Sequence, residues 1–157
     1  ARQGVFFVYI HAPPRAPPAP AEKRHHVGKW LWYVSNSRLD DVFLQVACSL
    51  AEGRLGDAAK APPPDSSSSS VVIVYTHDYR DEADVLRVGL ELRRLGATRT
   101  LSYKPDVFTL SEEPRPKGRN STFLLRAGCE ALFRTAGGEA LTEALRMSEK
   151  FKNNEFF

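Results

Sequence analysis

The sequence predicts an α/β protein of the α+β type, with a mainly antiparallel sheet and helices on one face. Short runs of aromatic and β-branched residues, which are typical of strands, recur along the chain. Two amphipathic segments fall between pairs of such runs, whereas a doubly wound parallel sheet needs a crossover helix after nearly every strand. The length of 157 residues suits a single domain with one core, which we expect to span residues 1–157.

The N-terminal third predicts two strands and a helix. Residues 5–11 favour a strand, and apolar residues at both parities indicate burial on both faces. Residues 12–24 form a connection that is first proline-rich and then basic, because proline at this density keeps the chain extended. A second strand follows at residues 28–35. Asn36 or Ser37 then caps a helix whose apolar residues recur at helical spacing.

The middle of the chain repeats this order. A short strand is predicted at residues 56–61, and a flexible loop of prolines and serines at 62–70. Residues 71–76 are the clearest strand of the sequence. Asp81 then caps a second amphipathic helix, which ends at Gly96.

The C-terminal third predicts two more strands, at residues 98–103 and 121–125, on either side of a polar, basic loop at 111–120. Helical composition returns at residues 127–136 and again in the C-terminal helix and tail of residues 139–157. Two consecutive glycines separate these pieces, and we expect them to break the helix.

Composition excludes several classes of protein. Hydrophobic residues at 42% and charged residues at 26% are ordinary for a globular protein and exclude wholesale disorder. No stretch approaches about 18 uncharged apolar residues, so no membrane partner is expected. The formal charge of +3 is mildly basic. Two cysteines, Cys48 and Cys129, imply neither a disulfide framework nor a metal set; we expect no metal, no cofactor and a cytoplasmic or other reducing compartment.

Four short motifs occur in a fixed order, and together they resemble a known family. They are Gly28-Lys29-Trp30-Leu31, Ala59-Lys60, Val74-Tyr75-Thr76-His77-Asp78 and Tyr103-Lys104-Pro105-Asp106-Val107-Phe108-Thr109. Over about residues 28–110 the chain resembles the basophilic leukaemia-expressed protein family, which is similar in fold to the cap-binding translation initiation factor 4E. The resemblance implies a curved antiparallel sheet backed by helices, in agreement with the predicted order of elements.

Lys60 is the first candidate site residue. A lysine between two alanines at a strand end is predicted to be partly buried, and burial lowers a lysine pKa in a way that suits phosphate contact or general-base work. The alternative is a lysine without a binding role, whose alkyl chain lies along apolar surface at a strand end while its ammonium group reaches solvent. The resemblance implies the functional role, because the cap binders place an anion-contacting cation near this point.

Cations later in the chain predict further contacts with an anion. Residues 114–126 carry four cations and no acidic residue, although Glu112 and Glu113 lie beside them. The alternative is a solvated loop whose charges only keep the protein soluble. The predicted phosphate-binding residues are Lys60, Arg99, Lys104, Arg115, Lys117 and Arg119.

Trp32 and Tyr75 are predicted to offer a stacking surface for a base, with core packing as the alternative. Recognition of a methylated cap needs a purine held between two aromatic faces. Trp30 and Trp32 have the same parity on one strand and therefore face the same way. Residues 12–24 contain no aromatic ring that would supply a second face, so cap binding is not predicted.

The favoured function is non-catalytic binding of a phosphate-bearing partner, RNA or a nucleotide, in the concave face of the sheet. One alternative comes from the resemblance, since members of the family are also labelled phosphothreonine lyases; it implies Lys60 as base on a phosphopeptide. The strand at 28–35 lacks the acid histidine of such enzymes, which leaves His77, beside Asp78, as the acid. The other alternative is a structural subunit whose proline-rich arm and Phe156-Phe157 tail dock on protein partners.

Overall fold

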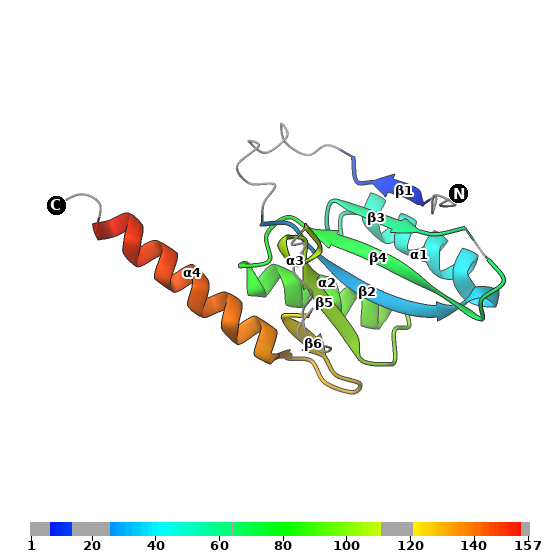
Figure 1. The fold of residues 1–157 in the computed structure, drawn as a ribbon. Helices are drawn as coiled ribbons and strands as arrows, with labels where there is room; N and C mark the ends of the chain where they lie inside the picture. The colour runs from blue at the N-terminus through cyan, green and yellow to red at the C-terminus, as the bar shows by residue number, and fades with distance from the viewer. Residues whose placement is uncertain (1–6, 14–25, 64, 111–120, 155–157) are drawn as a thin grey trace, which may run out of the picture.

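The computed structural model describes residues 7–13, 26–63, 65–110 and 121–154, and its centre is one antiparallel sheet of seven strands (Figure 1). The strand order is β1-β3-β4-β2-β5-β6-β7. The strands are β1 (Val8–His11), β2 (Gly28–Ser35), β3 (Ala58–Ala61), β4 (Ser69–Thr76), β5 (Leu101–Pro105), β6 (Phe123–Leu125) and β7 (Leu132–Arg134). The helices are the 3-10 turn η2 (Asn36–Arg38), α1 (Leu39–Ala51), α2 (Glu82–Arg94), α3 (Val107–Leu110) and α4 (Ala136–Asn154).

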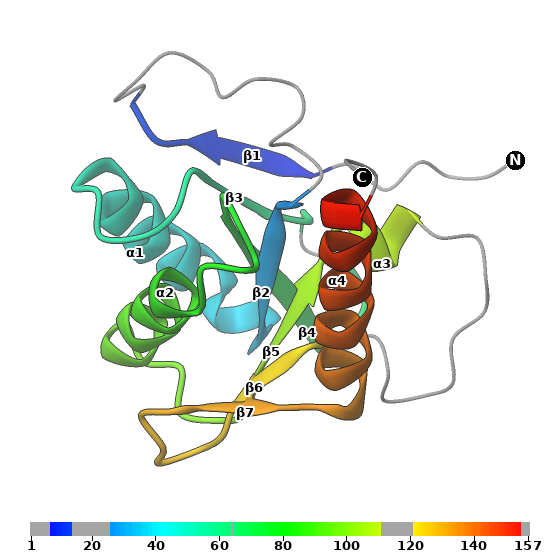
Figure 2. The ribbon, with the colours of Figure 1, turned by 90° about the vertical axis from the view of Figure 1, so that its left-hand side faces the viewer.

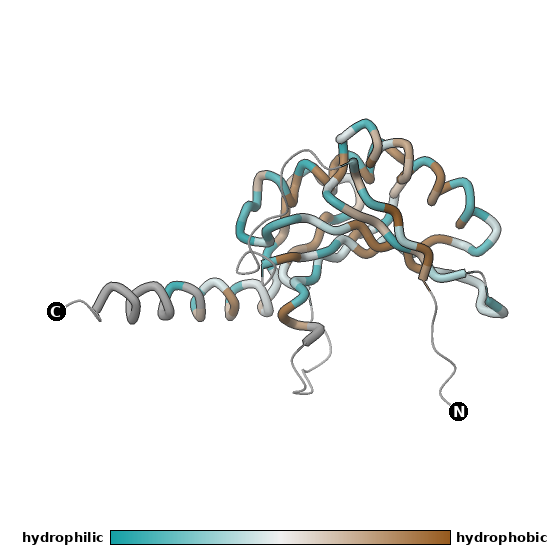
Figure 3. The backbone as a smooth tube through the Cα atoms, turned by 90° about the horizontal axis from the view of Figure 1, so that it is seen from above, coloured by the Kyte–Doolittle hydropathy of each residue, from teal (hydrophilic) through white to brown (hydrophobic). Residues whose placement is uncertain are grey.

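Helices α1 and α2 lie together on one side of the sheet, and the sheet curves beneath them (Figures 2 and 3). Their apolar stripes pack against alternate residues of the strands, among them Trp30 and Val74, to form the main buried cluster. The Trp30 Nε1 atom donates a hydrogen bond of 2.9 Å to the Val85 carbonyl and so ties β2 to α2. We call this side the helix face and the other side the open face.

The predicted architecture, a curved antiparallel sheet backed by helices, is therefore confirmed, and so is the cap of the second helix. The Asp81 side chain accepts a hydrogen bond of 3.1 Å from the Asp84 amide. The predicted cap of the first helix is wrong, because Arg38 occupies the N-cap position of α1 without a side-chain capping bond and a 3-10 turn precedes the helix. Asn36 instead donates to the Asp65 carbonyl at 3.3 Å and holds the proline and serine loop against β2.

The first strand is an edge strand, and its predicted burial on both faces is wrong. Val8 is 55% exposed and Tyr9 is 53% exposed, because β1 pairs only with β3 within the described part of the sheet. Residues 5–6 of the predicted strand lie outside the described residues. β4 begins two residues before the predicted strand, and β5 lies two to three residues after its predicted place.

The helix predicted at residues 127–136 is absent, since a turn and the strand β7 occupy this segment. The predicted break at the two glycines is also wrong, because α4 runs through both. A Cβ atom at Gly138 would collide with the Thr122 carbonyl oxygen, so glycine allows α4 to start close to β6. Thr135 caps the helix, accepting a hydrogen bond of 3.1 Å from the Gly138 amide.

Beyond this start, α4 extends away from the sheet (Figure 1). Among the described residues no helix combines the length and the apolar character needed to cross a bilayer.

Candidate functional site

The register of the strands gathers lysines and aromatic rings on the open face. Lys29 of β2 lies opposite Tyr75 of β4 on one side and opposite Lys104 of β5 on the other, so these three side chains share a face. Lys60 of β3 lies opposite Tyr9 of β1 and has the same parity as Tyr75. We call these five residues the open-face cluster. Helices α1 and α2 pack on the other face, so the cluster lies on the side of the sheet away from these two helices (Figure 2).

Lys60 is surrounded by aromatic rings. Its Nζ atom donates a hydrogen bond of 3.2 Å to the Tyr9 Oη atom. The same atom lies 4.3 Å from the ring centre of Phe7, 5.2 Å from that of Tyr9 and 5.8 Å from that of Tyr75. Such cation–π contacts favour the charged form of the lysine.

These contacts overturn the predicted direction of the pKa shift. Burial lowers the pKa of Lys60, but hydrogen bonds and charge interactions with Tyr75 and Tyr9 raise it, and the pKa ends above its ordinary value. Lys60 is therefore an ammonium ion at neutral pH. That state suits an anion-binding residue and does not suit a general base.

Lys29 and Asp106 form an ion pair within the candidate site. The Lys29 Nζ atom lies 2.6 Å from the Asp106 Oδ1 atom, and Lys29 is only 9% exposed. Asp106 is thus paired with Lys29, and Lys104 lies opposite Lys29 in the register of the same face. Sequence reasoning missed Lys29 and Asp106, although the alternation of Lys29 with the core residue Trp30 placed Lys29 on the open face.

Two predicted binding residues lie elsewhere. Trp32 is on the helix face and is 6% exposed, so its ring does not join Tyr75 on the open face, and it lines the same pocket as Arg99 instead. Arg99 lines a pocket of about 360 Å³ with Tyr33 and Arg38, near the Ser35 end of β2. Lys104 is at the Gly28 end, so Arg99 does not join it. The predicted Arg115, Lys117 and Arg119 lie outside the described residues.

His77 is not brought to Lys60. Its Nδ1 atom lies 3.4 Å from Asp84 of α2, and it lines a pocket with Leu55 on the side of the helices. Asp78 does not pair with it as predicted, because Asp78 binds Arg80 at 2.7 Å. The base and the acid of the lyase alternative therefore do not form one site.

Comparisons with known proteins agree with the fold. A family model described as "Basophilic leukemia-expressed protein Bles03" matches residues 19–111. Ascaris suum eIF4E-3 with m2,2,7G cap is a similar solved structure, at 18% identity and a TM-score of 0.51, with 71% of this chain and 66% of that chain covered. C. elegans eIF4E-3 with the 4E-binding protein Mextli and cap analog gives 20% identity and a TM-score of 0.54, with 70% and 67% covered.

Schistosome eIF4E complexed with m7GpppA and 4E-BP is also similar, at 18% identity and a TM-score of 0.53, with 66% of this chain and 61% of that chain covered. The chain thus spans about two thirds of the length of these structures. At such identities the likeness shows the fold alone.

Proposed function

The chain belongs to the family described as Basophilic leukemia-expressed protein Bles03, and on that premise we propose that its open face binds a phosphate-bearing partner, RNA or a nucleotide, without catalysing a reaction. The observation that carries the proposal is the placement of Lys60 and Lys104 on one face around Tyr75. Residues from β3 and β5, 44 positions apart in the sequence, contribute cations to the same surface.

The chemistry of the open-face cluster suits nucleic acid. Ammonium groups attract phosphates and release condensed counterions, which supplies most of the sequence-independent affinity for RNA. Tyr9 is half exposed, and its ring stacks on His11 with centres 6.4 Å apart and planes 9° apart. A flat pair of rings beside cations is the combination used to bind single-stranded bases.

A methylated cap is not the expected ligand, although the similar eIF4E-3 structures are complexes with a cap or a cap analog. Trp30 and Trp32 both lie in the core on the helix face. Neither ring can form the second wall of a sandwich on the open face.

Fluorescence anisotropy with a labelled single-stranded RNA at several salt concentrations tests the proposal. We expect affinity to fall steeply with salt, and Lys60→Ala and Lys104→Ala each to weaken binding roughly three- to tenfold because each removes a phosphate contact. Each variant should also reduce the slope of log K against log salt by about 0.7. A competition experiment with an unlabelled mononucleotide then shows whether the open face binds a single nucleotide or requires the RNA polymer.

Arg99→Ala is the matched control, since it removes the same charge from the other end of β2. In the same fluorescence anisotropy measurement, Arg99→Ala should change the affinity for RNA less than twofold. A flat response to salt, or equal effects of Arg99→Ala and Lys60→Ala, would contradict the proposal. A methylated cap analogue should compete no better than its unmethylated form.

A further inference from the structure

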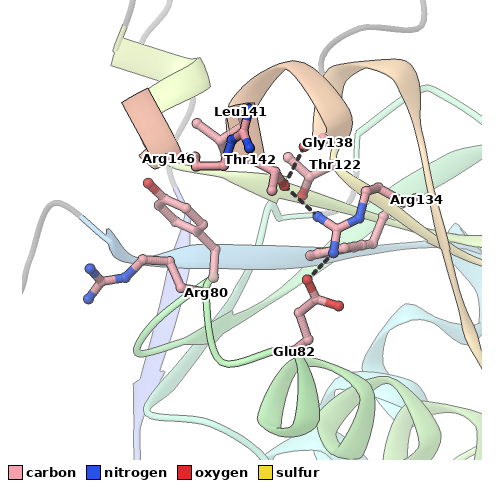
Figure 4. Close-up of a pocket in the computed structure, with 10 residues that line it drawn as sticks. Arg80, Glu82, Thr122, Arg134, Gly138, Leu141, Thr142 and Arg146 are labelled. Carbon is pink, nitrogen blue, oxygen red and sulfur yellow. Dashed lines mark hydrogen bonds and ion pairs between the residues drawn. The ribbon is translucent and has the colours of Figure 1, made fainter. Parts of the chain in front are cut away.

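A separate pocket lies where the start of α2, the strands β6 and β7 and the start of α4 meet (Figure 4). Its volume is about 320 Å³, which is the size of a small-molecule site. Phe123 and Arg134 lie opposite each other in the register, and Phe123 belongs to the core of the helix face. The pocket is therefore on the other side of the sheet from the open-face cluster.

Arg134 occupies the middle of this pocket and is held in place on three sides. Its Nη1 atom donates to Thr142 Oγ1 at 2.7 Å, and its Nη2 atom donates to Glu82 (Figure 4). Its guanidinium carbon lies 5.0 Å from the ring centre of Phe123. A guanidinium has five N–H donors, and these two bonds leave donors for a ligand. The guanidinium group of Arg134 is thus held in one position, while some of its N–H donors remain available to a ligand.

Thr122 supplies an independent sign of a missing polar partner. Thr122 is 2% exposed and lines the pocket. Its Oγ1 atom is buried and makes no hydrogen bond to any residue in the described part of the chain. Because an unpartnered buried hydroxyl is costly, a ligand group that accepts a hydrogen bond from it would be stabilising.

The remaining walls favour an amphipathic anion. Arg146 of α4 adds a second cation, although it is paired with Glu143 at 2.9 Å. Arg80 lines the rim, but it extends away from Arg134 toward Asp78 (Figure 4). Leu141 and Phe123 supply apolar surface. The pocket therefore combines the arginine fork of Arg134, which also holds the Glu82 carboxylate, with a hydroxyl and apolar surface.

We propose that this pocket binds a small phosphate monoester with an apolar body, its phosphate at Arg134 and Thr122 and its body against Leu141 and Phe123. A phosphate monoester carries three acceptor oxygens and a charge near −2, which matches an arginine fork beside a hydroxyl donor. Most of the lining residues follow residue 111, where the family match ends. The site is thus independent of the proposed RNA surface and is built largely outside the matched segment.

Isothermal titration with phenyl phosphate tests the assignment, with inorganic phosphate and benzyl alcohol as comparison ligands. We expect a Kd on the order of 1 mM for phenyl phosphate, and weaker binding of both comparison ligands because each lacks one half of the recognition. Thr122→Val keeps the shape and should weaken phenyl phosphate roughly tenfold, since it removes one bond to a charged group. Arg134→Lys should weaken it by about as much, because the fork is lost.

The melting temperature separates ligand recognition from a structural role. Thr122→Val removes an unpartnered hydroxyl, so the ligand-free variant should melt at the same temperature as the parent or higher. Lys60→Ala should leave the affinity for phenyl phosphate unchanged, which distinguishes this pocket from the open face. The assignment is overturned if benzyl alcohol binds as well as phenyl phosphate, if binding is not saturable, if Thr122→Val binds normally or melts lower, or if Lys60→Ala abolishes binding.

Discussion

Glu91 of α2 joins the two helices of the helix face through one carboxylate. It accepts hydrogen bonds from Arg94 at 2.6 Å, from Ser49 of α1 at 2.6 Å and from Arg54 at 2.8 Å. The bond from Arg94 does most to lower the pKa of Glu91; burial opposes it, Ser49 and Arg54 add to it, and the pKa falls to about 2. Such a carboxylate stabilises the folded state when it is ionised.

We expect Glu91→Gln to lower the free energy of unfolding by about 1–3 kcal/mol at pH 7. Because the folded pKa lies below the unfolded one, this contribution is complete above about pH 5 and is lost as the pH falls from the ordinary value of 4.5 toward 2. Urea unfolding of both proteins between pH 7 and pH 2.5 measures the difference, which should shrink with acid.

Glu143→Gln is the control for this prediction. Glu143 pairs with Arg146 at 2.9 Å, but both side chains are more than half exposed. Removal of such a surface pair should cost less than about 0.5 kcal/mol at any pH. An equal loss for both variants, or a Glu91→Gln difference that does not change with pH, would show that the hydrogen-bond network of Glu91 does not stabilise the fold.

Among the site residues, Lys60, Lys104 and Tyr75 could be named from the sequence because composition and resemblance both pointed to them. Their adjacency could not, since it depends on the order β3-β4-β2-β5. The direction of the Lys60 pKa shift was also beyond the sequence, because Tyr9 comes from a strand 51 residues away. A pKa depends on neighbours in space, and the local sequence does not contain them.

At the scale of elements, the distance between α2 and the sheet depends on Gly89. A Cβ atom there would lie 2.8 Å from Trp30 Cζ2 and 3.1 Å from Leu125 Cδ2. Gly89→Ala gains about 1 kcal/mol of helix propensity. We nevertheless expect a net loss of roughly 1–3 kcal/mol in unfolding free energy, because the fully buried Trp30 ring cannot move without disturbing the core.

Denaturant unfolding of Gly89→Ala measures this loss. The control is Ala83→Gly, the reverse substitution at an exposed position of the same helix. Ala83→Gly should lose up to about 1 kcal/mol through propensity alone. If Gly89→Ala proves more stable than the parent, the contact between α2 and β2 is looser than the structure shows.

Elements with strong periodicity or a run of strand-forming residues were predictable, whereas the segment at residues 127–136 was not. The apolar stripes of α1 and α2 and the cap at Asp81 follow from a few neighbouring residues. Residues 127–136 have helical composition, but Leu132–Arg134 pair with β6 as an edge strand. Pairing with a neighbouring strand outweighs a weak helix propensity, because propensity amounts to less than about 1 kcal/mol per residue.

At the scale of the whole molecule, α1, α2 and the central strands share one buried cluster. We therefore expect one cooperative unfolding transition in urea, followed by tryptophan fluorescence and by the main far-ultraviolet circular dichroism change. Both tryptophans belong to β2 at the middle of the sheet and report on this cluster. Midpoints that differ between the two signals would indicate two independent units and would contradict the predicted single domain.

The fold class, most strands and helices, and the family follow from the amino-acid sequence, because periodicity, caps and short motifs are properties of neighbouring residues. Long-range packing is needed to know that β1 is an exposed edge strand and that Lys29 and Lys104 lie opposite each other. It is also needed to know that Trp32 is buried and that Thr122 and Arg134 line a pocket with α4. Those outcomes depend on which segments far apart in the chain pack together. That choice is made by the burial of the whole apolar surface at once, which no local pattern specifies.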